Sequence, residues 1–214
     1  MSFSLRFSGA DVRILADERV FDGYFAMRRV TVQHRSFSGG WVEPLSREVF
    51  ERGDAVGVLP YDPVDDSLIL IEQFRPGSLR DTHSPWMLEL VAGIIETGES
   101  DDEVVRREAM EEAGCTLGDV VPIAGYYPSA GACSEYVRLY CGRVLGAGVG
   151  EVLGLSEEGE DILVHRLGRE DVLDLLAANR INNGHTLVAL QWFALHWEQL
   201  RPRWRDAPPP FSEL

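Results

Sequence analysis

Three glutamates near the middle of the chain have a spacing that could hold a divalent cation. Glu108 lies three residues before Glu111 and four before Glu112, so in a helix the three carboxylates would crowd one stripe. Like charges at these spacings cost about 0.2–0.5 kcal/mol per pair, so a positive partner is expected. Arg107 can pair with one carboxylate, and the remaining oxygens suit a hard cation such as Mg²⁺. The alternative is an ordinary solvated acidic helix face.

The residues around these glutamates follow a longer fixed pattern. Eight carboxylates lie between Glu96 and Glu112, against only two arginines. Residues 93–115 read GIIETGESDDEVVRREAMEEAGC, which matches GX5EX7REUXEEXGU at every fixed position. This pattern is the Nudix box. The chain therefore resembles a Nudix hydrolase, and an acidic face arising by chance is the weaker interpretation.

The resemblance implies that water attacks a diphosphate linked to another moiety, with metals bound by the helix. Glu108 and Glu112 match the main metal ligands, and Glu111 matches a frequent further contributor to catalysis. Gly93 matches a turn glycine that lets the backbone carbonyl of Ala92 face a metal. Mg²⁺ is the expected cofactor, and Mn²⁺ is expected to substitute for it.

Three more residues of the box are expected to keep the site in shape. Glu99 and Arg107 match the positions that hold the loop and the helix together, and Arg107 is also a candidate catalytic residue. Gly114 sits where a helix would end in a left-handed C-cap.

Five further segments resemble the ADP-ribose pyrophosphatase subfamily, and together they cover most of residues 20 to 200. They are residues 47–53, 70–75, 89–93, 154–162 and 190–192. In that subfamily an acidic loop after the last core strands supplies the catalytic glutamate and another metal ligand. By position, Glu158 would take the proton from the attacking water and Glu160 would bind metal. The alternative for this loop is a solvated acidic turn.

Four residues outside the box are candidates for substrate binding. Arg47 and Arg75 match substrate-contacting arginines, whose guanidinium can donate two hydrogen bonds to phosphate, although either alone could be a surface charge. The subfamily tends to exchange its N-terminal β region between two subunits. Tyr24 is then the candidate for stacking on adenine, whereas the bare sequence favours a core residue. Glu135 matches a loop residue that would face the distal sugar.

One departure from the subfamily concerns the substrate. Ser129-Ala130-Gly131 stands where the subfamily usually has Ser-Pro-Gly. Because that proline is associated with a preference for ADP-ribose, another nucleoside diphosphate sugar is an alternative substrate. A non-catalytic ADP-ribose-sensing module is a remote alternative. Such a module would show a degraded box and a basic helix-turn-helix, and neither is visible in the sequence. The leading interpretation is hydrolysis of ADP-ribose to AMP and ribose 5-phosphate by a homodimer.

Short strands and helices must position these residues. The first 50 residues alternate as in a small β region, residues 55–60 and 67–72 read as a hairpin, and further strands are expected at 86–92, 120–127 and 136–144. A capping box at Ser100 and Glu103 predicts a helix over 101–113, which would pack on the sheet through an apolar stripe. Helical spacing recurs at 169–179 and at 186–200, and the latter is apolar enough to be a buried structural helix.

These elements predict the α/β (α+β) class. The expected Nudix fold is a mixed β-sheet sandwiched between helices, preceded by an N-terminal antiparallel β extension. We expect an N-terminal β region over residues 1–53 that could be exchanged between subunits, a Nudix hydrolase domain over 54–204 and an extended tail over 205–214.

Composition excludes several other classes of protein. All 20 basic residues are arginines, so lysine Schiff bases, lysyl-biotin and a P-loop lysine are excluded. The net charge of −15 argues against a nucleic-acid partner or an anionic membrane surface. Neither a signal peptide nor a run of 18 apolar residues is visible, and the three cysteines lack disulfide or zinc spacing. We therefore expect a cytoplasmic enzyme.

Overall fold

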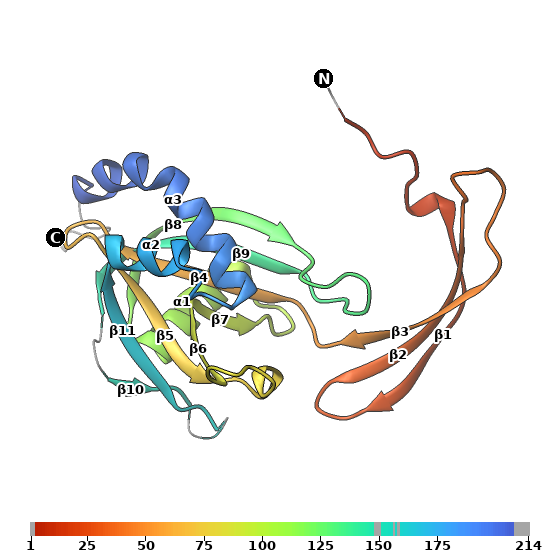
Figure 1. Cartoon of the computed structure of the whole chain (residues 1–214), viewed down its shortest axis with the longest axis horizontal. Coiled ribbons are helices and arrows are strands. Elements are labelled where there is room, and N and C mark those ends of the chain that lie inside the picture. The colour runs from red at the N-terminus through yellow and green to blue at the C-terminus, as the bar shows by residue number, and fades with distance from the viewer. Residues whose placement is uncertain (1–2, 148–150, 156, 158, 208–214) are drawn as a thin grey trace. The chain divides into compact units, whose positions relative to one another are not determined.

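The computed structural model describes residues 3–147, 151–155, 157 and 159–207, and it divides into two compact units (Figure 1). The first unit comprises Met1–Asp54 and Tyr127–Tyr136, and the second comprises Ala55–Tyr126 and Val137–Leu214. Each unit has its own sheet. Within the described part of the chain, no helix is both long and apolar enough to cross a membrane.

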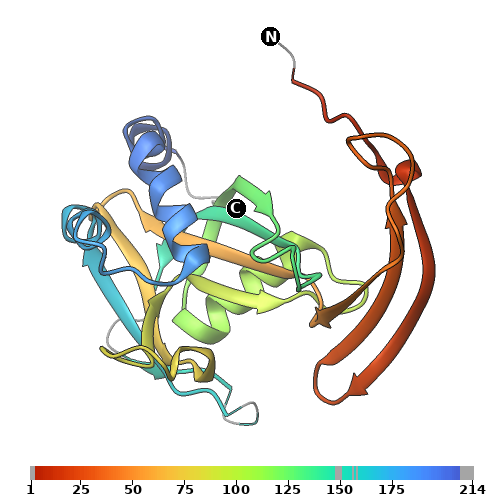
Figure 2. The ribbon, with the colours of Figure 1, turned by 45° about the vertical axis from the view of Figure 1, so that its right-hand side comes forward.

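The first unit is built on a three-stranded antiparallel sheet in the order β1-β2-β3. Its strands are β1 (Val12–Asp22), β2 (Ala26–His34) and β3 (Leu45–Glu51), preceded by the short 3-10 helix η1 (Gly9–Asp11). Figure 2 shows the three strands side by side. The loop from Tyr127 joins this unit through Phe50, whose N–H donates to the carbonyl of Ala132 at 2.7 Å. The predicted antiparallel extension is therefore present.

The second unit contains an eight-stranded mixed sheet. Its central path runs β10-β11-β5-β4-β9-β8, with β6 paired to β5 and β7 paired to β4. Only β4 and β9 are parallel among these pairs. The strands are β4 (Ala55–Asp62), β5 (Ser67–Phe74), β6 (Trp86–Glu89), β7 (Val91–Ile94), β8 (Thr116–Tyr126), β9 (Val137–Gly146), β10 (Val152–Leu153) and β11 (Ile162–Gly168).

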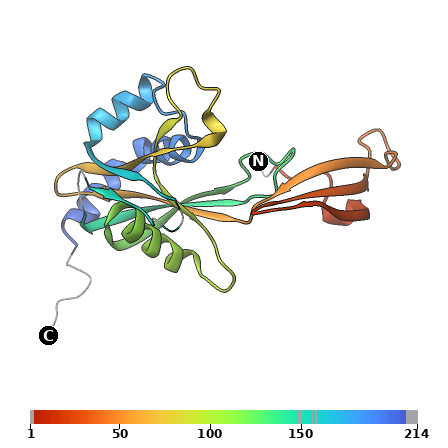
Figure 3. The same cartoon turned by 90° about the horizontal axis from the view of Figure 1, so that it is seen from below.

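Helices cover both faces of this sheet (Figure 3). α1 (Asp101–Ala113) packs on one face through Val104, Val105 and Ala109, which are fully buried with Ile69 and Ile71 of β5. α2 (Arg169–Ala177) and α3 (Gly184–Arg205) pack on the other face. There, buried side chains of the two helices join the core formed by alternate residues of the same strands. The predicted sandwich of a mixed sheet between helices is thus confirmed.

Two of the predicted elements differ in the structure, and the strands β10 and β11 were not predicted from the sequence. The single strand expected at 86–92 is two strands, because the N–H of Leu90 donates to Thr186 Oγ1 at 3.0 Å and the chain changes partner from β5 to β4 there. The helix expected at 186–200 runs from Gly184 to Arg205 and is buried along one stripe rather than all round. Leu195 on its outer side is 79% exposed.

Candidate active site

The local sequence of α1 determines how its glutamates are presented. The Ser100 hydroxyl accepts from the N–H of Glu103, and the Glu103 carboxylate accepts from the N–H of Ser100 at 2.8 Å. At the other end Gly114 adopts φ +57° and its N–H donates to the Met110 carbonyl. A side chain is strained at this φ, so glycine suits the position. The helix is therefore fixed at both ends, and its polar face carries the glutamates.

Arg107 neutralises part of this acidic face. Its guanidinium pairs with Glu99 at 3.1 Å, with Glu108 at 2.8 Å and with Glu111 at 3.1 Å. The hydrogen bonds from Arg107 are the main cause of a lowered pKa at Glu99. Glu99 also accepts from the N–H of Glu96 at 3.0 Å. Arg107 thus ties the loop before the helix to the helix itself.

Glu112 is the most deeply buried carboxylate of α1, with an exposed fraction of 3%. Burial raises its pKa to about 8, and the charges of Glu108 and Glu160 push in the same direction. The N–H of Ala92 donates to Glu112 at 3.0 Å and partly offsets this rise. Burial also raises the pKa of Glu108. We call Glu108, Glu112 and Glu160 the carboxylate site; Glu108 is paired with Arg107, whereas Glu112 has no ion-pair partner among the described residues.

Gly93 allows Glu108 to reach this position. It lies within β7, opposite Val56 of β4, so the predicted turn glycine is instead a strand residue. A Cβ added at Gly93 would lie 1.7 Å from Glu108 Oε1 and 2.2 Å from its Cδ. Glu108 can keep this position only if residue 93 is glycine, because its carboxylate occupies the space that a side chain of residue 93 would fill. The backbone φ of Gly93 is not the reason.

The acidic loop contributes Glu160 from the strand side. Glu160 Oε2 accepts from the N–H of Leu155 at 2.9 Å, and the Glu160 N–H donates to the Leu155 carbonyl at 3.2 Å. Its charge raises the pKa of both helix glutamates, so it lies close enough to act on them. Glu158, the predicted base, lies outside the described residues.

The donor set of the carboxylate site fits a hard divalent cation. Carboxylate oxygens that are partly buried and mutually repelling suit Mg²⁺, which favours oxygen ligands and would supply the missing positive charge. Among residues 3–147, 151–155, 157 and 159–207, however, no group of three or more His, Cys, Asp or Glu residues lies close enough together to hold a metal ion. The described side chains alone thus provide part of a coordination shell.

Arg75 follows β5 and brings positive charge to the carboxylate site. Its charge lowers the pKa of Glu112, which places it within electrostatic reach. The guanidinium is paired with Glu89 at 2.9 Å. Glu89 was missed as a functional candidate by the sequence prediction. The available signal was a single carboxylate inside the apolar run from Trp86 to Ala92.

The remaining substrate candidates belong to the first unit. Tyr24 is 89% exposed and contacts Phe25 edge-on at 4.7 Å, so its alternative interpretation as a core residue is wrong for the single chain. Arg47 is exposed and donates to the carbonyl of Ser46 at 2.8 Å. Glu135 is buried and paired with Arg52 at 3.3 Å, which gives it a partner within its own unit. Their roles toward a substrate stay predictions.

Comparison with known proteins agrees with this architecture. The ADP-ribose pyrophosphatase of Escherichia coli (strain K12) is 39% identical over 198 residues, covering 92% of this chain and 95% of that protein. The ADP-ribose pyrophosphatase of Haemophilus influenzae (strain ATCC 51907 / DSM 11121 / KW20 / Rd) is 37% identical over 208 residues, covering 96% of each. A GDP-mannose pyrophosphatase of Enterobacter sp. (strain 638) is 28% identical over 185 residues, covering 86% of this chain and 95% of that protein.

A solved structure described as an ADP compounds hydrolase has the same fold. It superposes with a TM-score of 0.68 at 26% identity, covering 94% of this chain and 100% of the other. The NUDIX domain family matches residues 51–214. The chain therefore belongs to the NUDIX domain family and is a Nudix hydrolase.

Proposed function

We propose that the protein hydrolyses ADP-ribose to AMP and ribose 5-phosphate with Mg²⁺. The observation that carries the proposal is the carboxylate site, where Glu112 is buried beside two other carboxylates and has no ion-pair partner among the described residues, with the Arg75 guanidinium in electrostatic reach. The names of the two most similar relatives described above support ADP-ribose as the substrate. In the reaction a water oxygen forms a bond to one phosphorus, and the bond from that phosphorus to the bridging oxygen breaks.

Each residue of the site has a proposed task. Glu108, Glu112, Glu160 and the carbonyl of Ala92 would hold Mg²⁺ or Mn²⁺, with Glu111 as a further contributor. When bound, such an ion supplies Lewis acidity toward phosphoryl oxygens and lowers the pKa of water. Glu158 would accept the proton of the attacking water.

Arginines are proposed to bind the diphosphate, because the chain has no lysine. Arg75 would donate to phosphate oxygens through its planar fork, and Arg47 is proposed as a second substrate-contacting arginine. Arg107 keeps Glu99, Glu108 and Glu111 in place through its ion pairs. Its contribution to catalysis is therefore proposed to be the orientation of these carboxylates.

We propose that the first unit forms the contact of a homodimer and serves substrate binding there. The unit leaves large apolar side chains exposed, including Ile14 and Phe21 on β1 and Tyr24 in the turn after it. Exposed apolar side chains are a feature of surfaces that become covered in an assembly. Tyr24 would stack on the adenine, and Glu135 would lie on the side of the distal sugar. Residues 1–53 would then be an exchanged β region, 54–204 the hydrolase domain and 205–214 a tail.

The cytoplasm is the proposed location. Cys115, Cys133 and Cys141 are all free thiols, and free thiols persist in a reducing compartment.

A second candidate substrate is another nucleoside diphosphate sugar. The departure at Ser129-Ala130-Gly131 favours it, and so does the similarity of the chain to a GDP-mannose pyrophosphatase. The site chemistry would be the same, since only the groups attached to the diphosphate differ.

A substrate panel tests both candidates. The protein is incubated with Mg²⁺ and ADP-ribose, ADP-glucose, GDP-mannose or flavin adenine dinucleotide, and the products are identified by mass. We expect AMP and ribose 5-phosphate, with the highest kcat/KM for ADP-ribose. A different sugar nucleotide that exceeds ADP-ribose by about tenfold in kcat/KM would make the second candidate the substrate.

A further inference from the structure

Glu89 is a buried carboxylate that faces four side-chain donors. It ends β6 and is 4% exposed. Arg75 donates to Glu89 Oε2 through Nε at 3.1 Å and through Nη2 at 2.9 Å. Gln73 Nε2 donates at 3.3 Å, and Asn183 Nδ2 donates to Oε1 at 3.0 Å. Both carboxylate oxygens therefore accept hydrogen bonds from described side chains.

Arg75 is held at its backbone as well as at its guanidinium. Its N–H donates to the carbonyl of Pro85 at 2.9 Å, and its carbonyl accepts from the Ser78 hydroxyl at 2.8 Å. Its side chain is nevertheless 42% exposed. Within the part of the chain that the structure describes, Nη1 has no hydrogen-bond partner. One edge of the guanidinium is thus fixed by Glu89, and another can donate outward.

The start of α3 fixes Glu89 in turn. Asn183 is the N-cap of α3, where its Oδ1 accepts from the N–H of Thr186 at 2.9 Å while its Nδ2 holds Glu89. The Thr186 hydroxyl donates to Asn183 Oδ1 and accepts from the N–H of Leu90. A continuous chain of hydrogen bonds therefore runs from α3 through Glu89 to Arg75.

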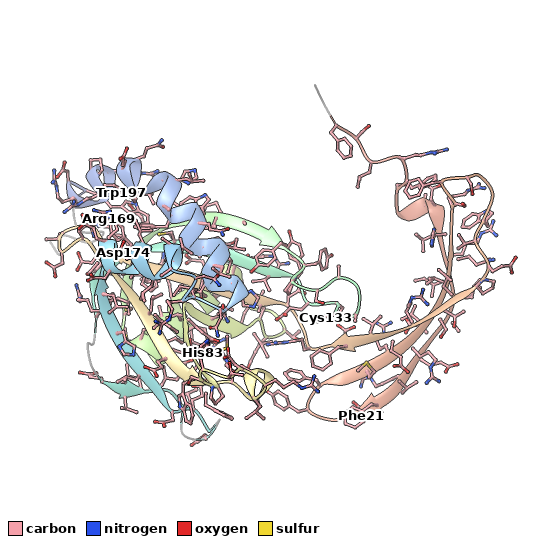
Figure 4. All side chains as sticks on the ribbon, in the orientation of Figure 1. Phe21, His83, Cys133, Arg169, Asp174 and Trp197 are labelled. Atoms are coloured by element: carbon pink, nitrogen blue, oxygen red, sulfur yellow. The ribbon has the colours of Figure 1, made fainter. Side chains whose placement is uncertain are left out.

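A second carboxylate cluster shows what a purely structural arrangement looks like. Asp66 accepts from the Tyr61 hydroxyl at 2.8 Å and pairs with Arg169 and Arg201, each at 3.1 Å. We call these four residues the Asp66 cluster. Figure 4 shows Arg169 near one end of β5 and His83, which belongs to the connection after Arg75, near the other end. The Arg169 side chain is only 12% exposed and lies over Trp197. It is enclosed, whereas Arg75 is half open beside the carboxylate site.

We propose that Glu89 is a positioning residue for the hydrolysis, which holds the Arg75 guanidinium in the orientation that binds the substrate diphosphate. The inference rests on the proposed function, because it requires Arg75 to bind the diphosphate. A guanidinium that is already oriented loses less side-chain entropy on binding phosphate, so Glu89 acts on substrate binding through Arg75.

A double-mutant cycle tests this role. Glu89→Gln keeps the shape of the side chain and removes its charge, so we expect KM for ADP-ribose to rise about tenfold with a smaller change in kcat. Arg75→Gln should raise KM by at least as much. If Glu89 acts through Arg75, the double variant should have the same KM as Arg75→Gln alone. A rise in KM in the double variant that equals the product of the two single rises would overturn the proposal.

Two matched controls separate positioning from stability. Asn183→Ser keeps an N-cap oxygen for α3 but removes the donor to Glu89, so we expect a rise in KM of about threefold with little change in Tm. Asp66→Asn should lower Tm and leave KM unchanged. An unchanged KM in Glu89→Gln, or an equal rise in Asp66→Asn, would overturn the proposal.

If the wild-type protein leaves the whole substrate panel intact, the proposed function fails and this inference fails with it. Multiplied losses in an active protein refute only the inference.

Discussion

The Asp66 cluster and the carboxylate site both bury acidic groups, but only the first surrounds its carboxylate with donors. Asp66 has a tyrosine hydroxyl and two arginines within 3.1 Å. Glu112 is more deeply buried, and its hydrogen bond comes from the N–H of Ala92. Its carboxylate neighbours Glu108 and Glu160 raise its pKa further.

This difference separates a structural carboxylate from a functional one. Burying a charge is costly unless it is paired and hydrogen-bonded, so folding alone does not account for the carboxylate site. Perturbed pKa values of this kind cluster at functional sites. The Asp66 cluster, by contrast, joins the β4–β5 turn to α2 and α3 and pairs its one carboxylate with two arginines.

Glu112→Gln should give the largest effect on activity. The substitution removes a proposed metal ligand while keeping its shape, so kcat should fall by roughly three orders of magnitude. The measurement is the steady-state rate at saturating Mg²⁺. Glu170→Gln on α2 is a matched control, because the Glu170 side chain is 85% exposed and its loss should leave the rate unchanged. A near wild-type rate for Glu112→Gln would remove the metal-ligand assignment.

The stability of the metal-free protein should depend on the same residue. Glu112 has a pKa of about 8 in the fold and an ordinary value of 4.5, so it takes up a proton on folding between these pH values. The buried negative charge of Glu112 lowers the free energy of unfolding. This effect is absent below the pKa of Glu112 in the unfolded chain and complete above its pKa in the fold. The free energy of unfolding should therefore fall as pH rises from about 5 to 8, by on the order of 3–4 kcal/mol.

Urea unfolding in EDTA at several pH values measures this slope. Glu112→Gln serves as the control, because the groups outside the carboxylate site titrate alike in both proteins and the difference reports the titration of Glu112 with its two carboxylate neighbours. The variant should also be the more stable protein at pH 8. If the free energy of unfolding changed with pH in the same way in both proteins, the burial of Glu112 would already be compensated by described neighbours.

The sequence predicted α1 to its final residue but did not predict the partners of Arg75. Ser100, Glu103 and Gly114 act on backbone groups within one turn, so helix ends and the spacing of the box glutamates are local information. Glu89 and Asn183 are 94 residues apart, and their contact depends on where α3 begins relative to the sheet. The break of the strand at Leu90 has the same origin, because its partner Thr186 is also distant.

The motif also pointed to Gly93, but the reason that it gave, a turn, differs from the reason that the structure shows. A motif shows that glycine is needed, but the cause is the approach of Glu108 from another element, which no local pattern contains. The assignment of residues 127–136 to the first unit is non-local in the same way, since Phe50 pairs with Ala132 and Ser134.

Asp66→Asn should affect stability rather than activity. It removes the anionic partner of Arg201 and leaves Arg169 with only the exposed Glu170, and breaking a buried pair of this kind costs about 2–3 kcal/mol after allowance for its partial exposure. The kcat/KM should stay within about threefold of wild type, because the cluster lies away from Arg75 along β5. Urea unfolding and steady-state kinetics on one preparation provide both values. A large loss of activity with unchanged stability would mean that the two regions do not divide structure and function between them.

Gly93→Ala should give the smallest effect, and it tests the carboxylate site without removing a charge. The new methyl group overlaps the end of the flexible Glu108 side chain, which can swing away, so stability should change little while kcat falls about tenfold. Gly57→Ala is the matched control on the paired strand, because a Cβ there meets Leu90 and Leu139 side chains at 2.7 and 2.8 Å. That variant should lose stability through overpacking by about 1–3 kcal/mol and keep Glu108 in place. If Gly93→Ala instead lost stability and kept its kcat, the close approach of Glu108 to β7 would serve packing and not the reaction.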